Sequence, residues 1–466
     1  MSSIKRPPGP KGHLLLGVLP EIREEDVKYA TRMAREYGDI VFMRVVNIPT
    51  YLISHPRYIE EVLVTNYRNF IKAVYLRESR ALFGEGLLTS DGDAWVRERR
   101  IGQRAFRHEH IDTYAETIVR FTERKLGQWE NGDTRDVHQE MMRLTLEIIA
   151  RVLFGRELAD EVESAEHAIS VYLHQFADRF GMYVVPEWVP TPGNLRYRRA
   201  MRCLDGIIYD AIREGRRSNG DERSLLAAFL HAQQHYGIEM TDVQLRDEMA
   251  TLFFTGHETT GLALTWTLFL LGENPAAEAR LIEELETVLG DRPVTMDDLR
   301  RLKYLDCVIK ESLRLYPPAY GVVREALSDC EIGGFTIPKG ATVAMFQWVV
   351  HRDPRFFEDP ESFRPERWED GLFDHLPKFA YFPFGGGPRN CIGKDFAQFE
   401  IALVLATMMR KFRFRTVNGH RTWPLPSLTL RPEYGMRMEL SKSAVESRGQ
   451  QFTVNSQELR RPTVDC

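Results

Sequence analysis

The residues best suited to chemistry lie in one glycine-rich loop with a single cysteine. Positions 384–393 read Phe-Gly-Gly-Gly-Pro-Arg-Asn-Cys-Ile-Gly, with Cys391 near the end. Three glycines permit unusual dihedral angles and let the backbone approach a flat ligand closely. We expect a helix to begin near Lys394, and the free N–H groups and dipole at its start favour a thiolate. A thiolate held in this way is a soft, electron-rich metal ligand.

Other interpretations of the loop fit less well. A dinucleotide-binding loop needs glycine at offsets 1, 3 and 6, but counting from Gly385 the sixth residue is Asn390. A phosphate-binding Walker loop needs four residues before its Gly-Lys pair and then Ser or Thr, whereas here five intervene and Asp395 follows. A nucleophilic cysteine needs a nearby histidine, which the segment lacks. A buried structural cysteine explains neither the glycines nor Arg389.

A second unusual segment lies within the longest apolar stretch, Met249–Gly272. Its length is enough to span a bilayer, but His257 and Glu258 stand in the middle, where charge is expensive. We therefore expect a helix through the core of a large domain. Gly256 and Gly261 each cost about 1 kcal/mol in a helix interior, and buried polar groups need partners. We expect this turn to have a function that helix packing alone does not explain.

With these two segments the chain resembles the cytochrome P450 haem-thiolate monooxygenases. The family signature is matched in full by Phe384, Gly387, Arg389, Cys391 and Gly393. Three further motifs occur in family order, namely Trp95-x-x-x-Arg99, Glu311-x-x-Arg314 and Phe363-Arg-Pro-Glu-Arg367. The resemblance runs from about Pro7 to Leu440 and implies a mainly α fold with a small β region, the triangular single-domain P450 fold.

The resemblance also implies the cofactor and its ligands. Haem b is expected, with Cys391 as the proximal iron ligand, whose electron donation favours O–O cleavage, and with Phe384 packed beside the sulfur. The residues implied to bind the haem propionates are Trp95, Arg99, Arg324 and Arg389. Guanidinium groups suit carboxylates; for Arg99 the alternative is a solvated helix face. The Glu311–Arg314 pair, completed by Arg367, is expected to be structural and to support the cysteine loop.

Residues Thr255–Thr260 match the family's oxygen-activation motif. The resemblance implies that Gly256 leaves room for dioxygen, that Thr259 donates a hydrogen bond in the oxygen pocket, and that Glu258 relays protons. The residue at position 255 is more often alanine in this family. We therefore expect the extra hydroxyl of Thr255 to alter the oxygen pocket or to contact substrate.

The elements that must position these residues are predicted to be mostly helical. Apolar residues three and four apart predict helices from about Pro56 to Leu271, and a last helix from Lys394 to about Lys411. The segments predicted as strands are Ile40–Arg44, Thr50–Ser54, Glu331–Ile337 and Ala341–Val350. A loop is expected at Pro186–Asn194. Residues 1–440 are expected to form one domain, and the polar residues 441–466 a mobile tail.

The composition of the 466 residues is that of an ordinary globular protein, with 43% hydrophobic and 28% charged residues. The net charge of −5 gives no reason to expect a nucleic-acid partner. Five cysteines with no Cys-x-x-Cys pair argue against a disulfide framework or zinc ribbon and favour a cytoplasmic location. The N-terminus lacks the apolar core of a signal peptide, so no membrane anchor is expected.

The family's substrate-contact segments are rich in Phe, Leu, Val and Tyr, which implies a lipophilic small molecule such as a fatty acid, steroid or terpene. They map to Phe70–Leu88, Phe176–Val185, Met249–Thr259, Ala319–Val323 and Ser427–Leu428; the alternative is that these residues are only core. O₂ is the expected cosubstrate. Because no flavin or iron–sulfur module is evident, electrons are expected from a separate ferredoxin or flavodoxin and its reductase, docking near the basic segment Arg97–Arg107. The alternative functions are a peroxide-driven peroxygenase and a non-catalytic haem sensor or carrier.

Overall fold

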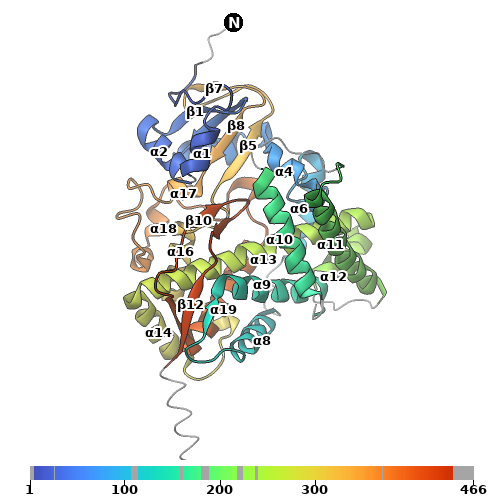
Figure 1. The fold of residues 1–466 in the computed structure, drawn as a ribbon, viewed down its shortest axis with the longest axis vertical. Helices are drawn as coiled ribbons and strands as arrows, with labels where there is room; N and C mark the ends of the chain where they lie inside the picture. The colour runs from blue at the N-terminus through green and yellow to red at the C-terminus, as the bar shows by residue number, and fades with distance from the viewer. Residues whose placement is uncertain are drawn as a thin grey trace, which may run out of the picture.

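Long helices fill most of the molecule, and the largest sheet lies at one end (Figure 1). The structure is a computed structural model that describes residues 5–25, 27–106, 114–157, 161–179, 188–217, 224–236, 240–369 and 371–443. The longest helix, α13, crosses the middle of the molecule, with α9 beside it (Figure 1). The expected mainly α architecture with a small β region is confirmed.

The helices have these bounds: α1 Leu19–Glu25, α2 Val27–Tyr37, α3 Pro56–Glu60, α4 Val74–Glu78, α5 Arg80–Phe83, α6 Gly92–Ala105, α8 Ala115–Leu126, α9 Val137–Phe154, α10 Val162–Arg179, α11 Pro192–Arg217, α12 Leu225–Tyr236, α13 Asp242–Glu273, α14 Pro275–Leu289, α15 Met296–Leu299, α16 Lys303–Leu315, α17 Gln347–Val350, α18 Leu372–His375 and α19 Lys394–Lys411. Short π- or 3₁₀-helical turns are η1 Glu61–Thr65, η2 Tyr67–Asn69, η4 Pro365–Trp368 and η5 Gly387–Arg389.

The strands are β1 Ile40–Val45, β2 Ile48–Ile53, β3 Phe70–Lys72, β4 Thr134–Asp136, β5 Val322–Ala326, β6 Cys330–Ile332, β7 Phe335–Ile337, β8 Thr342–Met345, β9 Phe412–Thr416, β10 Pro424–Pro426, β11 Leu430–Pro432 and β12 Arg437–Lys442. The five-stranded sheet has the order β1-β2-β8-β5-β3. Its edge strand β3 runs antiparallel to β5 and places Lys72 directly opposite Arg324. The smaller sheets are β4-β12-β9, β6-β7 and β10-β11.

Helix α13 is a core helix, as its apolar sequence predicts. It begins at a capping box formed by Thr241 and Gln244. From Leu245 to Leu268 every residue is buried except Thr255, Gly256 and Thr259, which leaves one accessible face in the middle of the helix. Among the residues that the structure describes, no helix combines the length and apolar character needed to cross a bilayer.

The expectation that packing cannot explain the two glycines of α13 is wrong. A Cβ atom at Gly256 would lie 2.9 Å from two side-chain carbons of Ile149, and one at Gly261 would lie 2.8 Å from the sulfur of Met142. Both positions therefore face α9 and allow the two helices to approach closely. The missing side chain of Gly256 makes room for Ile149, and the room for dioxygen expected there stays a prediction. A hydrogen bond of 3.0 Å from Thr145 Oγ1 to the His257 carbonyl ties the helices together at this point.

Most expected elements are present with shifted ends. The strand predicted over residues 341–350 is wrong in its second half, where α17 replaces it, because a short apolar run does not distinguish a strand from a buried helical turn. The loop predicted to end at Asn194 ends earlier, since α11 begins at Pro192, and residues 181–187 lie outside the described part. Strand β12 continues to Lys442, two residues into the expected tail, and residues 444–466 are likewise not described.

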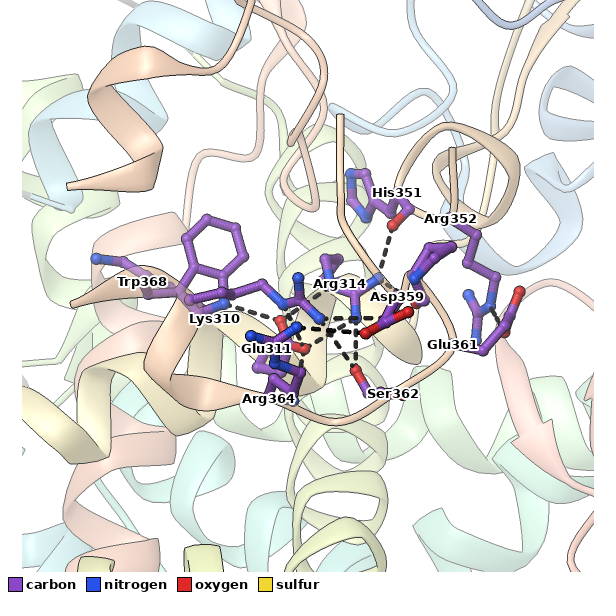
Figure 2. Close-up of polar contacts among 12 residues, drawn as sticks. Lys310, Glu311, Arg314, His351, Arg352, Asp359, Glu361, Ser362, Arg364 and Trp368 are labelled. Atoms are coloured by element: carbon purple, nitrogen blue, oxygen red, sulfur yellow. Dashed lines mark hydrogen bonds and ion pairs between the residues drawn. The ribbon is translucent and has the colours of Figure 1, made fainter. Parts of the chain in front are cut away.

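A buried carboxylate, Glu311 on α16, joins this helix to the irregular chain that leads to the cysteine loop (Figure 2). Arg314 donates to both carboxylate oxygens, at 2.9 and 2.8 Å. Arg367 Nε and the backbone N–H of Arg364 add bonds of 2.9 Å, as does the indole N–H of Trp368. The hydrogen bonds and the paired cations lower the pKa of Glu311 although burial alone would raise it. The expected structural ion pair is present and carries more partners than the motif predicts.

The same cluster is connected to the cysteine loop by a short chain of hydrogen bonds. Arg314 Nη1 donates to the His351 carbonyl at 2.8 Å, as Figure 2 shows. The ring Nε2 of His351 accepts the backbone N–H of Phe382 at 2.9 Å, and the Phe382 carbonyl accepts the N–H of Gly385 at 2.9 Å. Burial and the nearby arginines lower the pKa of His351 well below its usual range, so the ring stays neutral and Nε2 remains an acceptor.

We expect Arg314→Ala to lower the free energy of unfolding by about 3–5 kcal/mol, because Glu311 would lose its closest buried cation. Urea unfolding followed by tryptophan fluorescence measures the change. Arg32→Ala is the matched control: Arg32 pairs with Glu25, both partly exposed (42% and 32%), and such pairs are worth about 0–1 kcal/mol. Equal urea midpoints for Arg314→Ala and the parent would contradict the structural assignment.

Candidate active site

The cysteine loop is held in its shape by glycines with left-handed backbone angles. Gly385 and Gly387 have φ values of +70° and +67°, which other residues rarely adopt. A Cβ atom at Gly387 would also lie 2.0 Å from the carbonyl oxygen of Leu63. The N–H of Cys391 donates to the Phe384 carbonyl at 2.9 Å and closes the loop just before α19. The glycines are thus required by the turn itself and by its close contact with η1.

Cys391 combines dense surroundings with an accessible sulfur. Burial raises the pKa of its thiol and outweighs the Gly393 N–H and the positive charge of Arg99, both of which lower it. The Gly393 N–H at the start of α19 acts in the expected direction, and a bound metal cation would stabilise the thiolate further. The side chain nevertheless keeps accessible surface, whereas Cys307 is buried. Cys391 is thus within reach of a ligand.

Arg99 lies on α6 and is directed toward the cysteine loop. Its guanidinium donates to the Asn390 carbonyl at 2.8 Å and to the Asn390 side-chain oxygen at 2.6 Å. Only 8% of the residue is exposed, so the alternative of a solvated helix face is wrong. Its Nε is buried without a partner. The role of Arg99 toward a propionate stays a prediction, since its terminal nitrogens are already bonded to Asn390.

Three basic side chains, Lys72, Arg324 and Arg389, gather between β3, β5 and the cysteine loop; we call them the cationic cluster. Arg389 donates to Asp91 at 3.0 Å and to the Phe70 carbonyl at 2.6 Å, and its guanidinium lies 5.2 Å from the ring centre of Trp95. Arg324 donates only to the neighbouring carbonyl of Val323 among the described residues. Lys72 Nζ donates to the Leu87 and Ser90 carbonyls.

The positive charge of the cationic cluster exceeds the negative charge of the groups around it. Burial, together with the charges of Arg389 and Arg324, lowers the pKa of Lys72 to about 7, although Asp91 opposes the shift. Burial and Arg389 likewise lower the pKa of Arg324 to about 10. Like charges opposite one another on adjacent strands are destabilising. An anionic ligand with two carboxylates would relieve this repulsion, and the buried, unpartnered Nε of Arg389 offers it another donor.

Lys72 is the member of this cluster that sequence reasoning missed. A single lysine at the end of a short strand carries no motif, and the expected interpretation of such a residue is a solvated side chain. Only the register of β3 against β5 places it opposite Arg324. The other expected members, Trp95, Arg324 and Arg389, lie together as predicted by their motifs, whereas Arg99 lies on the cysteine side.

The accessible face of α13 carries two hydroxyl groups one turn apart. Thr255 Oγ1 donates to the Thr251 carbonyl at 2.7 Å, and Thr259 Oγ1 donates to the Thr255 carbonyl at 2.8 Å. In this arrangement the Thr259 hydroxyl donates to the helix, and the donation into the oxygen pocket expected of it stays a prediction. Its oxygen retains lone pairs that can accept a hydrogen bond from this face.

Glu258 points away from this face into a buried ion pair. Arg431 of β11 donates to both carboxylate oxygens, at 2.7 and 2.6 Å, and Thr429 Oγ1 adds a bond of 2.7 Å. Burial alone would raise the pKa of Glu258, but Arg431 and these hydrogen bonds hold it at about 2. In this arrangement Glu258 is a fully bonded carboxylate. The proton relay expected of it stays a prediction, which requires one oxygen to leave Arg431.

The expected substrate-contact segments divide into core and accessible residues. The phenyl rings of Phe70, Phe83 and Phe254 are buried in the hydrophobic core. For these residues the alternative is correct: they are core residues and do not line a substrate site. The accessible apolar residues from the same segments are Leu88, Phe176, Val322, Val323 and Leu428. Together with the accessible face of α13 they provide apolar surface of the kind that binds a lipophilic molecule.

Comparisons with known proteins agree with this arrangement. The family model described as cytochrome P450 matches residues 7–439. Cyclooctatin synthase of Streptomyces melanosporofaciens is 36% identical over 402 residues, 84% of this chain and 87% of that protein. Cyclooctat-9-en-7-ol 5-monooxygenase of the same organism is 35% identical over 386 residues, 82% and 84% of the two chains. Pentalenene oxygenase of Streptomyces avermitilis is 32% identical over 407 residues, 87% and 90% of the two chains.

Among solved structures, retinoic-acid-bound cyanobacterial CYP120A1 superposes with a TM-score of 0.83 at 27% sequence identity, covering 95% of this chain and 100% of that one. The matched family implies a haem cofactor. The accessible Cys391, the buried guanidinium of Arg324 and the Nε atoms of Arg99 and Arg389, which have no hydrogen-bond partner among the described residues, fit such a group, which carries a metal and two carboxylates.

We expect Arg324→Met to release haem at least about tenfold faster, because a hydrogen bond to a charged group is worth about 1.5–3 kcal/mol. Transfer of haem to an excess of an acceptor protein measures the rate. The urea midpoint of the haem-free protein should not fall, since Arg324 has no carboxylate partner among the described residues.

Arg389→Met is the control for this prediction. This substitution breaks the ion pair with Asp91. It should therefore speed haem release and also lower the stability of the haem-free protein. If Arg324→Met released haem no faster than the parent, the cationic cluster would not be the propionate site.

Proposed function

The chain belongs to the cytochrome P450 family and is a monooxygenase, and we propose that it inserts one atom of O₂ into a lipophilic terpene, using electrons from a separate protein. The observation that carries the proposal is Cys391, held by the glycine loop with its sulfur accessible. The proposed cofactor is haem b, since the sequence contains no Cys-x-x-Cys-His segment for covalent attachment.

When bound, the haem supplies O₂ activation, which a proximal thiolate promotes. The role of Cys391 is to provide that thiolate, and Arg99 and the Gly393 N–H stabilise its charge. The role of Trp95 and the cationic cluster is to hold the two propionates. Phe384 packs against the hydrophobic core, and its proposed role is to lie beside the sulfur of Cys391.

On the other side of the site, Thr259 is proposed to pass a proton toward the reacting oxygen. Its hydroxyl accepts a hydrogen bond through a free lone pair and donates through the proton now shared with the Thr255 carbonyl. Glu258 is proposed to contribute a proton only after one of its oxygens leaves Arg431. In the arrangement described it fixes α13 to β11.

The proposed substrate class is supported by the relatives and by the lining residues. Two relatives are named for oxygenation of cyclooctat-9-en-7-ol and of pentalenene, which favours a terpene over a fatty acid or a steroid. The accessible residues Val322, Val323 and Leu428 offer apolar contacts. The hydroxyl of Thr255, on the accessible face of α13, is the polar group proposed to contact an oxygen already present on the substrate.

A ferredoxin or flavodoxin with its reductase is the proposed electron source, in the cytoplasm. Arg97 and Arg100 are exposed on α6, the helix from which Arg99 reaches Asn390, the neighbour of Cys391. An acidic protein docked on α6 would therefore be one helix away from the iron ligand. Raising the ionic strength should weaken that encounter.

Turnover of a terpene panel with a surrogate ferredoxin and reductase tests the function. Isotopically labelled O₂ should place one labelled atom in the product. Product formed from hydrogen peroxide alone would favour a peroxygenase, and haem binding without any turnover would favour a sensor or carrier.

We expect Cys391→His to lose the strongly red-shifted Soret band that the carbon monoxide complex of the reduced, thiolate-ligated protein should show. Cys203→Ser is the control and should keep it, because Cys203 is exposed on α11 and outside the site. The ligand assignment would be wrong if Cys391→His retained the red-shifted band.

We expect Thr259→Ala to keep haem content and substrate affinity while more of the electrons appear as hydrogen peroxide and less as organic product, because proton delivery is no longer directed. Product and peroxide formed per NADPH measure the partition. Thr255→Ala/Thr259→Ala should be more uncoupled than either single variant, since the Thr255 hydroxyl one turn earlier can substitute. Coupling equal to that of the parent in both Thr259→Ala and the double variant would remove the hydroxyl from proton delivery.

A further inference from the structure

A second buried carboxyl group on α13, Glu248, lies two turns before the accessible face. Only 2% of Glu248 is exposed, and its Oε1 has no hydrogen-bond partner among the described residues. The N–H of Leu87 provides the hydrogen bond that the carboxyl does receive. A buried, ionised carboxylate needs a cation in contact, and no ion pair joins Glu248 to any residue that the structure describes.

The charged residues near Glu248 already have other hydrogen-bond partners. Asp247 on the same helix accepts from Arg246 at 3.0 Å and from the Glu85 N–H at 2.8 Å. Glu98 on α6 accepts from Ser90 Oγ, and Lys72 on β3 donates to the carbonyls of residues 87 and 90. Arg246 Nε in turn donates to Asp205 of α11 at 2.7 Å.

Glu248 is therefore in its neutral, protonated form near pH 7. Burial, together with the Glu98 and Asp247 carboxylates, raises its pKa to about 8, although the Leu87 N–H and Lys72 oppose the shift. Glu258 has the opposite character, with a pKa of about 2 and three hydrogen bonds from Arg431 and Thr429. Of these two carboxyl groups on α13, Glu248 holds a proton to give and Glu258 does not.

Three threonines continue from Glu248 toward the accessible face; we call Thr251, Thr255 and Thr259 the threonine row. Spacings of three and four residues keep Glu248 and the row on one side of the helix. At 1.5 Å per residue the steps are about 4.5, 6 and 6 Å along the axis. Thr251 Oγ1 is buried and has no hydrogen-bond partner among the described residues, so it is free to accept and donate.

The backbone opposite the threonine row passes close to the hydroxyl of Thr251. A Cβ atom at Gly86 would lie 2.5 Å from Thr251 Oγ1, so the loop that bonds Glu248 can pass over the row only because this residue is glycine. The hydroxyls of Thr255 and Thr259 each donate to a carbonyl four residues earlier, which orients both along the helix.

We propose that Glu248 is the proton store of this enzyme and that the threonine row carries its proton to Thr259. In each turnover Glu248 gives up one proton, becomes a carboxylate, and takes a proton from solvent before the next. Single water molecules or rotating hydroxyls span steps of this length. The inference rests on the proposed function, because it supplies the proton that the Thr259 hydroxyl passes on.

The test begins with the protonation state, which requires no turnover. An infrared difference spectrum of the haem-loaded protein, below minus above pH 8, should show the carbonyl stretch of a protonated carboxylic acid that titrates near pH 8. Glu248→Gln should abolish that band. A spectrum of Glu248→Gln identical to that of the parent would overturn the proposal whatever the enzyme's activity.

The second measurement is the ratio of organic product to hydrogen peroxide as a function of pH. In the parent the ratio should fall as pH rises through about 8, because Glu248 then ionises and has no proton to give. In Glu248→Gln the ratio at pH 7 should be about tenfold lower and independent of pH in this range. Glu248→Asp, which keeps a carboxyl group, should restore part of the ratio and of the pH dependence.

Two further variants separate relay from structure. Thr251→Val should keep the infrared band of Glu248 yet lower the ratio about as much as Glu248→Gln does. Thr265→Val is its control: Thr265 lies on the same helix, buried, and donates to the Gly261 carbonyl, but is outside the row. If Glu248→Gln does not fold, Thr251→Val tests the proton relay in its place.

Glu400→Gln is the control for the carboxyl group. Glu400 on α19 is buried with both oxygens unpartnered, and burial raises its pKa well above the usual range. Its replacement should leave the product ratio and the band near pH 8 unchanged. A parent that oxidises no substrate would contradict the proposed function alone, whereas a productive Glu248→Gln with the parent's pH profile would contradict the proton store alone.

Discussion

The position of the cysteine loop depends on one buried carboxylate. Glu311 accepts five hydrogen bonds, from Arg314, Arg364, Arg367 and Trp368, in surroundings with no solvent exposure. An ion pair so deeply buried is tolerated only when every lone pair and every proton is used. Arg314 therefore bonds the carbonyl of His351, whose ring fixes Phe382 just before the glycines. A helix more than seventy residues earlier in the chain thus holds the cysteine loop in register.

Paired and unpaired charges divide the interior into structural and functional regions. Glu311 and Glu258 each have a full set of partners, and both tie a helix to an irregular segment or an edge strand. Arg324 of the cationic cluster has no carboxylate partner among the described residues, and Oε1 of Glu248 has no hydrogen-bond partner there. Because an unpaired buried charge or acid is costly, its retention points to a ligand or a proton transfer that uses it. The distinction explains why two acidic residues on one helix, ten positions apart, have opposite protonation states.

The sequence was informative wherever local chemistry decides the structure. The bounds of α19, the pairing of β1 with β2 and the shape of the Cys391 loop follow from periodicity, turn residues and a motif with few alternatives. Contacts between distant segments were not predictable. Lys72 meets Arg324 through strand register, Trp368 completes the Glu311 cluster through an indole N–H, and Arg431 reaches Glu258 from a strand far along the chain. The packing role of Gly256 was missed because the identity of the opposing side chain, Ile149, cannot be read from a linear pattern.

The opposed cations Lys72 and Arg324 sit on β3, a three-residue strand at the edge of its sheet. Repulsion there should weaken a strand that has only one neighbour in its sheet, and the proposed binding of cofactor carboxylates would relieve it. A group that binds only the folded form stabilises it by mass action. Poorly stabilised chains are removed by cellular proteases. The amount of this protein in a cell is therefore expected to follow the supply of haem as well as the rate of its own synthesis.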